Sequence, residues 1–472
     1  MIESAFTLIC FILIGAGLIP PTLDFTLLKG RKIVSPYLVL LGLTLSGIIL
    51  GYLSIEMFGQ GTVPIYGRIL QVGFFEIFLS LIATIGGILV VVASLSGVKD
   101  WPTSPSFYSL LALGVLGSYF LISMGDFVLL IGAWALVSII SYVLVGLKKD
   151  RASTEAAAKY ALMGILASVL IIYGVAIIYG LIGSTDVGTI SDLTGNGKFM
   201  LLLGSVFLVA AFGFKIGIVP FHGWLPDVYG KAHPTLIAFL TGVMTVAVVG
   251  LVVKVLFPLA SALGNQWPIL IGILSIITMT FGNVVALLQR NVQRMMAYSS
   301  VAHVGYILVG ATAALSAGRA LGLQGIALHL GSYAFAKVGI FVFLAYLLRK
   351  GSGLHLNDLK GLGRSMPIVS VAVGIILLNL IGIPPLLGFW SKFYLFTSVI
   401  AVSPWIALVA IINSGISVGY YIQPINYMFF KGGSEPPEEK LGDSESITII
   451  AALVLIIVGG LTFPMIAPYL VT

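Results

Sequence analysis

The chain alternates between long apolar runs and short polar connections. Fourteen runs are each about 20 residues long, which is enough to cross a bilayer as a helix. They fall at 2–21, 33–55, 74–96, 107–123, 127–147, 157–182, 199–220, 234–259, 267–289, 296–316, 321–348, 367–398, 404–430 and 447–470. The pattern predicts an all-α, multi-pass membrane protein with about 14 transmembrane helices, forming a single membrane domain over residues 1–472.

Composition supports this prediction, because 59% of the 472 residues are hydrophobic and only 9% are charged, against about 25% charged residues in a soluble domain. A net charge of +7 would suggest nucleic acid as the partner of a soluble chain, but here the lipid bilayer is the expected surrounding and the position of the charges matters more. The single Cys10 excludes a disulfide framework or a cysteine-ligated iron–sulfur cluster within this chain.

The basic residues of the loops are divided unevenly between the two sides of the membrane if successive loops alternate. One set of loops carries only Arg68, Lys198 and Arg319. The opposite set carries Lys29, Arg31, Lys32, Lys99, Lys148, Lys149, Arg151, Lys231, Arg290, Arg294, Arg349, Lys350, Lys360, Arg364, Lys431 and Lys440. By the positive-inside rule the second set is cytoplasmic, which places both termini outside. We expect a prokaryotic plasma (inner) membrane, with a thylakoid membrane as the alternative.

Proline interrupts two of the predicted helices close to a lysine. The seventh contains Pro220 in FKIGIVPFHGW, and the twelfth contains Pro384 and Pro385 in GIPPLLGFWSKFY. Proline lacks the backbone N–H and breaks or kinks a helix. Paired interruptions in two halves of a membrane protein indicate an internal repeat with functional sites near the midplane.

We therefore predict two inverted repeats of five helices. The first spans 107–259 (helices 4–8) and the second spans 267–430 (helices 9–13). A polar cytoplasmic loop at 431–446 then leads to a last helix at 447–470.

Four lysines fall within the predicted spans: Lys215, Lys254, Lys337 and Lys392. A charge inside the bilayer costs roughly 2.5 to 3.5 kcal/mol on insertion scales and usually serves a function. Lys254 lies near the outer end of its helix, where its ammonium can extend to the interface. The acidic residues all fall in loops or near helix ends on this map, so no carboxylate compensates the deep lysines. Burial then favours the neutral amine, and such lysines can accept and release protons.

Two histidines extend this set. His329 precedes Lys337 by eight residues, about two helical turns on a similar face, and His303 lies among small polar residues in AYSSVAHVGY. Each is as compatible with a structural role as with a proton relay. His222, His233 and His355 lie near the cytoplasmic side, as proton entry points or as caps of turns. No spacing suggests a metal site, and no phosphate-binding or dinucleotide motif is present.

Four blocks, at 155–185, 214–235, 283–310 and 382–396, resemble the antiporter-like membrane subunits of respiratory complex I and its relatives, most closely the subunit N (mitochondrial subunit 2) type. The resemblance implies a subunit of a redox-driven proton pump, in which a central line of ionisable residues couples distant quinone chemistry to proton translocation. It assigns Lys215 and Lys392 to the central lysines of the two broken helices, and Lys337 to the helix 11 lysine of related antiporter-type subunits.

The same resemblance implies where the chemistry occurs. This chain carries no redox centre and no cofactor, while quinone, flavin and iron–sulfur clusters belong to other subunits of an oxidoreductase complex. The other membrane-arm subunits are the expected partners.

Two positions depart from the family pattern. Helix 5 usually carries a glutamate that pairs with the helix 7 lysine, and here WALVSIISYVL has Ala135 instead; in helix 8 a lysine position holds Thr245. The partner of Lys215 must then be water, another subunit or a distant acid such as Asp126. Three interpretations stay open: a rewired pump, a half-channel through helices 11 and 12 only, or a mainly structural subunit. A separate alternative is an Mrp-type cation/proton antiporter.

Overall fold

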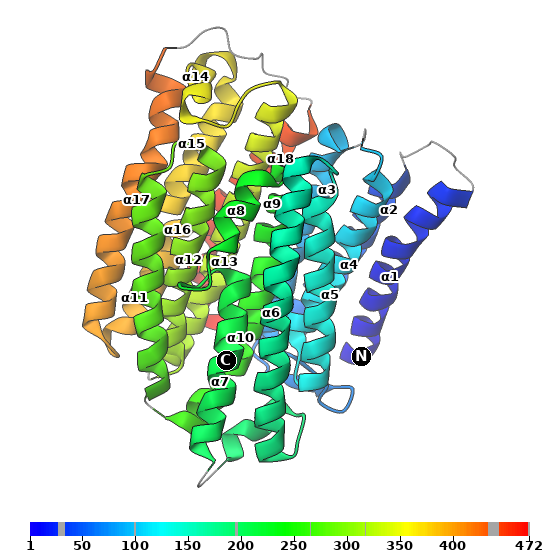
Figure 1. Ribbon diagram of the computed structural model, residues 1–472, viewed down its shortest axis with the longest axis vertical. Helices are drawn as coiled ribbons and strands as arrows, with labels where there is room; N and C mark the ends of the chain where they lie inside the picture. Colours follow the sequence, from blue (N-terminus) through cyan, green and yellow to red (C-terminus); the bar gives the residue numbers. More distant parts are fainter. Residues whose placement is uncertain are drawn as a thin grey trace.

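The computed structural model describes residues 1–26, 34–98, 101–193, 197–264, 266–316, 318–432 and 443–470. Nearly all of this is helical, and the long helices stand roughly along one direction in a single bundle (Figure 1). The first half contains α1 (Ile2–Thr26), α2 (Val34–Glu56), α3 (Phe74–Gly97), α4 (Ser104–Ser123), α5 (Phe127–Gly146), α6 (Arg151–Ile182), η1 (Val187–Asp192), α7 (Lys198–Ile216), α8 (Trp224–Lys231), α9 (Pro234–Phe239), η2 (Leu240–Met244) and α10 (Thr245–Leu263). The second half contains α11 (Gln266–Leu287), α12 (Val292–Ala314), α13 (Arg319–Arg349), η3 (Leu356–Leu359), α14 (Leu362–Ser365), α15 (Pro367–Ile381), α16 (Leu387–Ile400), α17 (Pro404–Phe430), α18 (Ser444–Ile466) and η4 (Ala467–Tyr469).

The number of membrane crossings agrees with the sequence pattern. Among the described residues, 12 helical segments are long and apolar enough to span a bilayer. The two other predicted spans correspond to α12, which carries serines and a histidine, and to the interrupted pair α15 and α16. The all-α membrane fold is confirmed, whereas the division into two inverted repeats stays a prediction.

Both termini lie at the same end of the bundle (Figure 1). The backbone N–H of Tyr66 donates to Glu3 Oε1 at 3.0 Å, and the rings of Phe58 and Tyr469 pack 4.6 Å apart. Between these contacts, a short antiparallel hairpin pairs β1 (Val63–Ile65) with β2 (Leu70–Val72). An even number of crossings explains this arrangement. Which end faces the cytoplasm stays a prediction from loop charge, and Lys29, Arg31, Lys32, Lys99 and Lys440 from that count lie outside the described residues.

The centre of the bundle is α13. Its most apolar stretch is completely buried, whereas that of α1 is only 28% buried. Polar residues on α13 are therefore shielded from lipid on every side, and His329 and Lys337 both belong to this helix.

The two predicted helix breaks are present. The first lies between α7 and α8 and contains Pro220, and the second lies between α15 and α16 and contains Pro384 and Pro385. Each upstream half-helix ends at a glycine in the left-handed region, Gly217 (φ 86°) and Gly382 (φ 96°), where a side chain would be strained.

One side chain bridges each break. Trp224 Nε1 donates to the backbone oxygen of Phe214 at 2.6 Å, which satisfies a carbonyl at the end of α7. Asn379 Oδ1 accepts the backbone N–H of Gly388 at 2.7 Å. Such bonds supply partners for the backbone groups that every helix end leaves open.

The predicted eighth helix contains a feature that the sequence did not indicate. Between α9 and α10 the backbone adopts a π-helical turn, η2, and the Thr245 hydroxyl donates to the backbone oxygen of Leu240 at 3.1 Å. Helix α3 approaches this turn closely, because a Cβ atom on Gly86 would lie 2.6 Å from the Gly242 carbonyl oxygen. Single π-turns frequently occur at functional sites. The predicted loop at 431–446 falls mostly on 433–442, outside the described residues.

Candidate functional site

Lys337 is completely buried in the middle of α13. Its ammonium donates to the backbone oxygen of Met296 and to Ser299 Oγ, both at 2.7 Å. The same nitrogen lies 5.7 Å from the centre of the Tyr333 ring. Two short acceptors and one aromatic face stabilise the charge here without a carboxylate.

Ser299 connects Lys337 to the next group. Its hydroxyl lies 2.5 Å from Tyr421 Oη, and Tyr421 Oη lies 2.9 Å from His303 Nε2. All of these residues are at most 2% exposed. Tyr421 comes from α17, so a helix distant in sequence completes the contact between the lysine and the histidine.

The two histidines contact one another directly. His303 Nδ1 lies 2.9 Å from His329 Nε2, and His329 Nδ1 lies 3.1 Å from Ser391 Oγ. Ser391 in turn donates to the backbone oxygen of Gly388 at 2.9 Å. The hydrogen-bonded chain therefore runs without interruption from α13 through α12 and α17 back to α13, and ends in the broken helix at α16.

Lys392 follows Ser391 at the end of this chain. Its ammonium donates to the backbone oxygen of Ile381 at 2.8 Å and to Ser414 Oγ at 2.9 Å, and it lies 4.9 Å from the centre of the Tyr306 ring. Ile381 is the last residue of α15, so the cation meets the negative end of that half-helix dipole. The break at Gly382 is what exposes this carbonyl to a side chain.

Lys215 occupies a separate enclosure in the first half. It lies in the last turn of α7, 7% exposed, and donates to Ser138 Oγ at 3.2 Å and to Ser141 Oγ at 3.0 Å. Three rings surround the ammonium: Trp134 at 5.7 Å, Tyr142 at 4.8 Å and Tyr160 at 5.0 Å. Hydroxyl groups and aromatic faces therefore surround this ammonium.

Within this chain, two serines contact the Lys215 ammonium. Asp126, the acid that the sequence offered as a partner, caps the start of α5, where its Oδ1 accepts the backbone N–H of Val128 at 2.7 Å. Ala135 has an exposed side chain one turn before Ser138 on the same helix. The spacing S-x-x-S in helix 5 could have indicated the two serines as a polar face.

Aromatic side chains also connect the two halves. Tyr160 stacks on Trp224 with ring centres 4.2 Å apart, and the Trp224 ring lies 6.3 Å from that of Tyr229. The Tyr229 ring in turn packs edge to face on Phe341 of α13, with ring centres 5.9 Å apart. These rings lead from the surroundings of Lys215 to the helix that carries Lys337.

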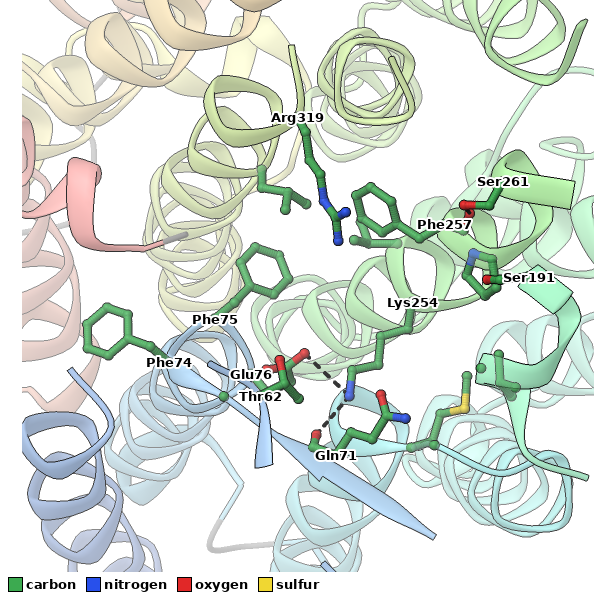
Figure 2. A pocket seen from close by; sticks show the side chains of 18 of the residues that line it. Thr62, Gln71, Phe74, Phe75, Glu76, Ser191, Lys254, Phe257, Ser261 and Arg319 are labelled. Carbon is green, nitrogen blue, oxygen red and sulfur yellow. Dashed lines mark hydrogen bonds and ion pairs between the residues drawn. The ribbon is translucent and has the colours of Figure 1, made fainter. Parts of the chain in front are cut away.

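Lys254 lies close to the end of the bundle that holds the termini, where protein groups hold its ammonium. Its side chain is only 10% exposed, and its ammonium donates to the backbone oxygen of Gln71 at 2.8 Å and lies 3.3 Å from Glu76 Oε1 (Figure 2). Glu76 does lie in the first turn of α3, as a helix-end residue, but it is only 7% exposed. The sequence missed this pair because the two residues are distant along the chain.

Histidines near the other end act as caps. His233 Nδ1 accepts the backbone N–H of Thr235 at 3.4 Å at the start of α9, and burial together with the charge of Lys148 lowers the pKa of His233 to about 4. At pH 7 the His233 ring is therefore neutral, so its Nδ1 can accept this hydrogen bond. His355 forms a capping box with Asp358. Among the described residues, no group of three or more potential metal-ligating side chains is found.

Comparison with known proteins places this arrangement in a family. Residues 124–417 match the family model described as NADH:quinone oxidoreductase/Mrp antiporter, TM. The chain is 33% identical over 95% of its length to NADH-quinone oxidoreductase subunit N 2 of Chloroherpeton thalassium, covering 90% of that protein. It is 32% identical to F(420)H(2) dehydrogenase subunit N of Methanosarcina mazei, covering 95% of this chain and 93% of that one.

A solved structure gives the same result. A chain of respiratory complex I from Thermus thermophilus with bound aureothin superposes with a TM-score of 0.81 at 27% identity, covering 98% of this chain and 99% of that chain. The chain belongs to the family of antiporter-like membrane subunits of complex I and related dehydrogenases, of the subunit N type, and is a subunit of such an oxidoreductase complex.

Proposed function

We propose that this subunit translocates protons in a complex I-like, redox-driven pump, and that its relay runs through Lys337, His303, His329 and Lys392, with Lys215 as a second element. The observation that carries the proposal is the unbroken hydrogen-bonded chain from Lys337 Nζ to Ser391 Oγ, in which no step exceeds 3.1 Å. Proton transfer between side chains requires contacts of this length.

The charge of Lys337 sets the direction of the chain. An ammonium has three donors and no acceptor, so Ser299 must accept from Lys337 and its own hydrogen then points to Tyr421. Tyr421 in turn donates to His303 Nε2, so His303 carries its proton on Nδ1 and donates to His329. In this orientation each hydroxyl or ring hydrogen of the chain is donated in one hydrogen bond.

The hydrogen bonds at the Ser391 end of the chain point in the same direction. His329 then carries its proton on Nδ1 and donates to Ser391 Oγ, whose hydrogen goes to the Gly388 carbonyl. When Lys337 gives its proton to the chain, each link shifts by one position and the imidazole of His329 can hold the arriving charge. Lys392 lies near this imidazole, and like charges repel. A proton reaching His329 therefore favours proton loss from Lys392.

The first half supports a weaker element of the relay. Lys215 has hydroxyl partners at 3.0 Å and 3.2 Å but no carboxylate among the residues described around it, so its charge is stabilised less than in an ion pair. The rings of Tyr160, Trp224 and Tyr229 lead from its enclosure toward α13, the helix that carries Lys337. We infer that the half containing Lys337 and Lys392 carries most of the coupling.

Partners and redox groups are inferred from the relatives. Their names describe quinone-linked and F420H2-linked dehydrogenases, so the quinone, flavin and iron–sulfur clusters belong to neighbouring subunits, and the other membrane-arm subunits are the partners of this chain. With the basic loops in the cytoplasm, both termini face the outside.

Two other functions make different demands on the site. An Mrp-type antiporter that binds sodium would need oxygen-rich, carboxylate-containing ligands, whereas lysines and histidines form the central chain here. A purely structural subunit is favoured by Ala135, which removes the carboxylate partner of Lys215. Neither alternative accounts for three buried cationic or imidazole side chains, Lys337, His303 and His329, joined in one hydrogen-bonded chain that ends beside Lys392.

Two measurements test the proposal. Purification of the native complex should recover this chain with subunits that contain iron–sulfur clusters, and recovery of the chain alone or in an antiporter assembly would contradict it. In energised vesicles, Lys392→Ala and Lys337→Ala should each abolish most redox-driven proton uptake, with a smaller loss for Lys215→Ala. Near-normal uptake by all three variants, with intact assembly, would contradict the proposal and show that the subunit is mainly structural.

A further inference from the structure

A cavity of about 390 Å³ opens at the end of the bundle that holds both termini (Figure 2). Its walls come from the β1–β2 hairpin and from α3, η1, α10 and α13. Lys254 and Glu76 lie together at one side, and Arg319 covers the Phe257 ring at 4.6 Å on another. Polar side chains such as Ser191 and Ser261 complete a lining that suits water.

The ion pair in this wall is incompletely satisfied. Glu76 Oε1 lies 3.3 Å from the Lys254 ammonium, but Glu76 Oε2 is buried and has no hydrogen-bond donor among the described residues. An unsatisfied buried polar atom costs about 1–3 kcal/mol. Glu76 lines the cavity beside Lys254, and a buried carboxylate oxygen without a donor is suited to hold a proton.

A polar face on α3 leads inward from Glu76. Ser80 and Thr84 follow at intervals of four residues, so the three side chains lie on one face of the helix, and all three are buried. The Thr84 hydroxyl donates to the backbone oxygen of Ser80 at 2.6 Å and makes a short hydrogen bond with Tyr119 Oη. This face covers about two helical turns, or roughly 12 Å, from the cavity toward the bundle centre.

The π-helical turn lies between α3 and the helix that carries Lys337. A Cβ atom on Gly86, two residues after Thr84, would lie 2.6 Å from the Gly242 carbonyl oxygen, and one on Gly242 would lie 2.5 Å from Val338, the residue after Lys337. On the neighbouring α4, Ser118 Oγ lies 3.9 Å from the sulfur of Met244, the last residue of the turn.

We propose that this cavity is the port through which protons leave the subunit, with Glu76 and Lys254 as its terminal proton carriers. The proposal rests on the proposed function, since it gives the central relay its outer end. The Lys254 ammonium passes a proton to the Glu76 carboxylate, which leaves a neutral pair. Glu76 then gives this proton to water in the cavity, and Lys254 is recharged from the polar face of α3.

Substitutions in the intact complex test the port. Glu76→Gln keeps the shape but cannot release a proton, and Lys254→Met keeps the length but not the charge, so each should lower redox-driven proton release at least fivefold in vesicles. Arg68→Gln is the control, because Arg68 lies at the same end, forms a 3.4 Å ion pair with Asp186 and does not line the cavity. Its proton release should stay at the wild-type rate.

Lys337→Met, measured in parallel, separates the two proposals. If Lys337→Met stops proton release while Glu76→Gln and Lys254→Met release protons at the wild-type rate, the port is wrong and the proposed function stands. If the Lys337→Met complex also pumps normally, the proposed function is wrong, and the proposed port is wrong as well.

Access to the cavity provides a second measurement. In a Cys10→Ala background, Ser191→Cys places a thiol in the cavity wall, while Asp192→Cys places one on its exposed neighbour outside the lining. A membrane-impermeant maleimide added from the side of the termini should label both, but should slow proton release only in the Ser191→Cys complex. Equal rates after complete labelling, or labelling only from the opposite side, would overturn the port.

Discussion

The imidazole rings of His303 and His329 meet nitrogen to nitrogen at 2.9 Å, with only one proton between them. A change of tautomer in one ring therefore forces a change in the other. The outer nitrogens bind Tyr421 and Ser391, so in the relay that we propose the pair passes the proton state of Lys337 to the broken helix that carries Lys392. Direct coupling of this kind leads to a first prediction.

His329→Gln should separate hydrogen bonding from proton transfer. The glutamine amide can donate and accept like the imidazole, but it cannot take a proton at one atom and release another. We expect an assembled complex whose redox-driven proton pumping falls about tenfold or more. Pumping can be followed with a pH-sensitive dye in vesicles and assembly by native gel; an unchanged rate would exclude His329 from the relay.

Two buried tyrosines offer a matched pair of substitutions. Tyr421→Phe removes the hydroxyl that links Ser299 to His303 among the described residues, whereas Tyr108→Phe removes a 3.1 Å bond with Ser94 Oγ outside the chain. Both tyrosines are at most 1% exposed, so each variant should lose about 1–3 kcal/mol of stability. Only Tyr421→Phe should lose most proton pumping. Equal pumping losses in the two variants would show that the effect is structural.

The second helix break depends on Asn379. Its side chain accepts from the backbone of Gly388 and donates to Ser332 Oγ at 2.9 Å. Asn379→Leu keeps the volume but leaves both groups unpaired, so we expect a stability loss of about 2–3 kcal/mol, measured as a lower melting temperature of the purified complex. Thr397→Val serves as the control, because that hydroxyl bonds only within its own helix. A melting temperature equal to the control would contradict the bridging role.

An ion-pair cluster joins the end of α13 to the start of α18. Arg349 Nη2 lies 2.7 Å from Asp443 Oδ2, and Lys350 lies 3.5 Å from the same oxygen. Partial burial acts to raise the pKa of Asp443, but the hydrogen bonds and charges of Arg349 and Lys350 outweigh it and hold the pKa below its usual value. Stability from this group is therefore present above the ordinary aspartate pKa and is lost as the pH falls through the lowered value.

Asp443→Asn tests this dependence. At pH 7 the variant should melt below the wild type, and the difference should shrink as the pH falls below about 4, where the wild-type carboxylate becomes protonated. A difference that is constant from pH 7 to pH 3 would mean that Asp443 contributes through packing alone.

The sequence by itself determined the membrane fold and the deep lysines. Runs of about 20 apolar residues leave the chain no soluble alternative. Proline disfavours a helix interior, and the prolines that lie close to a glycine and a lysine, Pro220 and Pro384, are the ones at breaks, whereas Pro258 and Pro424 lie inside continuous helices. Buried charge in an apolar segment is a local feature, which is why Lys215, Lys337 and Lys392 stood out.

Only the tertiary structure decided what these lysines contact. Ser299 and Tyr421 are 122 residues apart, and Glu76 meets Lys254 from another helix; such pairs follow from helix packing, which no periodicity along the chain encodes. A hydroxyl at a helix face is an ordinary residue in sequence, and it joins a hydrogen-bonded chain only where a neighbouring helix places a partner within about 3 Å. The π-helical turn at Leu240–Met244, against which α3 packs at Gly86, likewise has no local signal in the sequence.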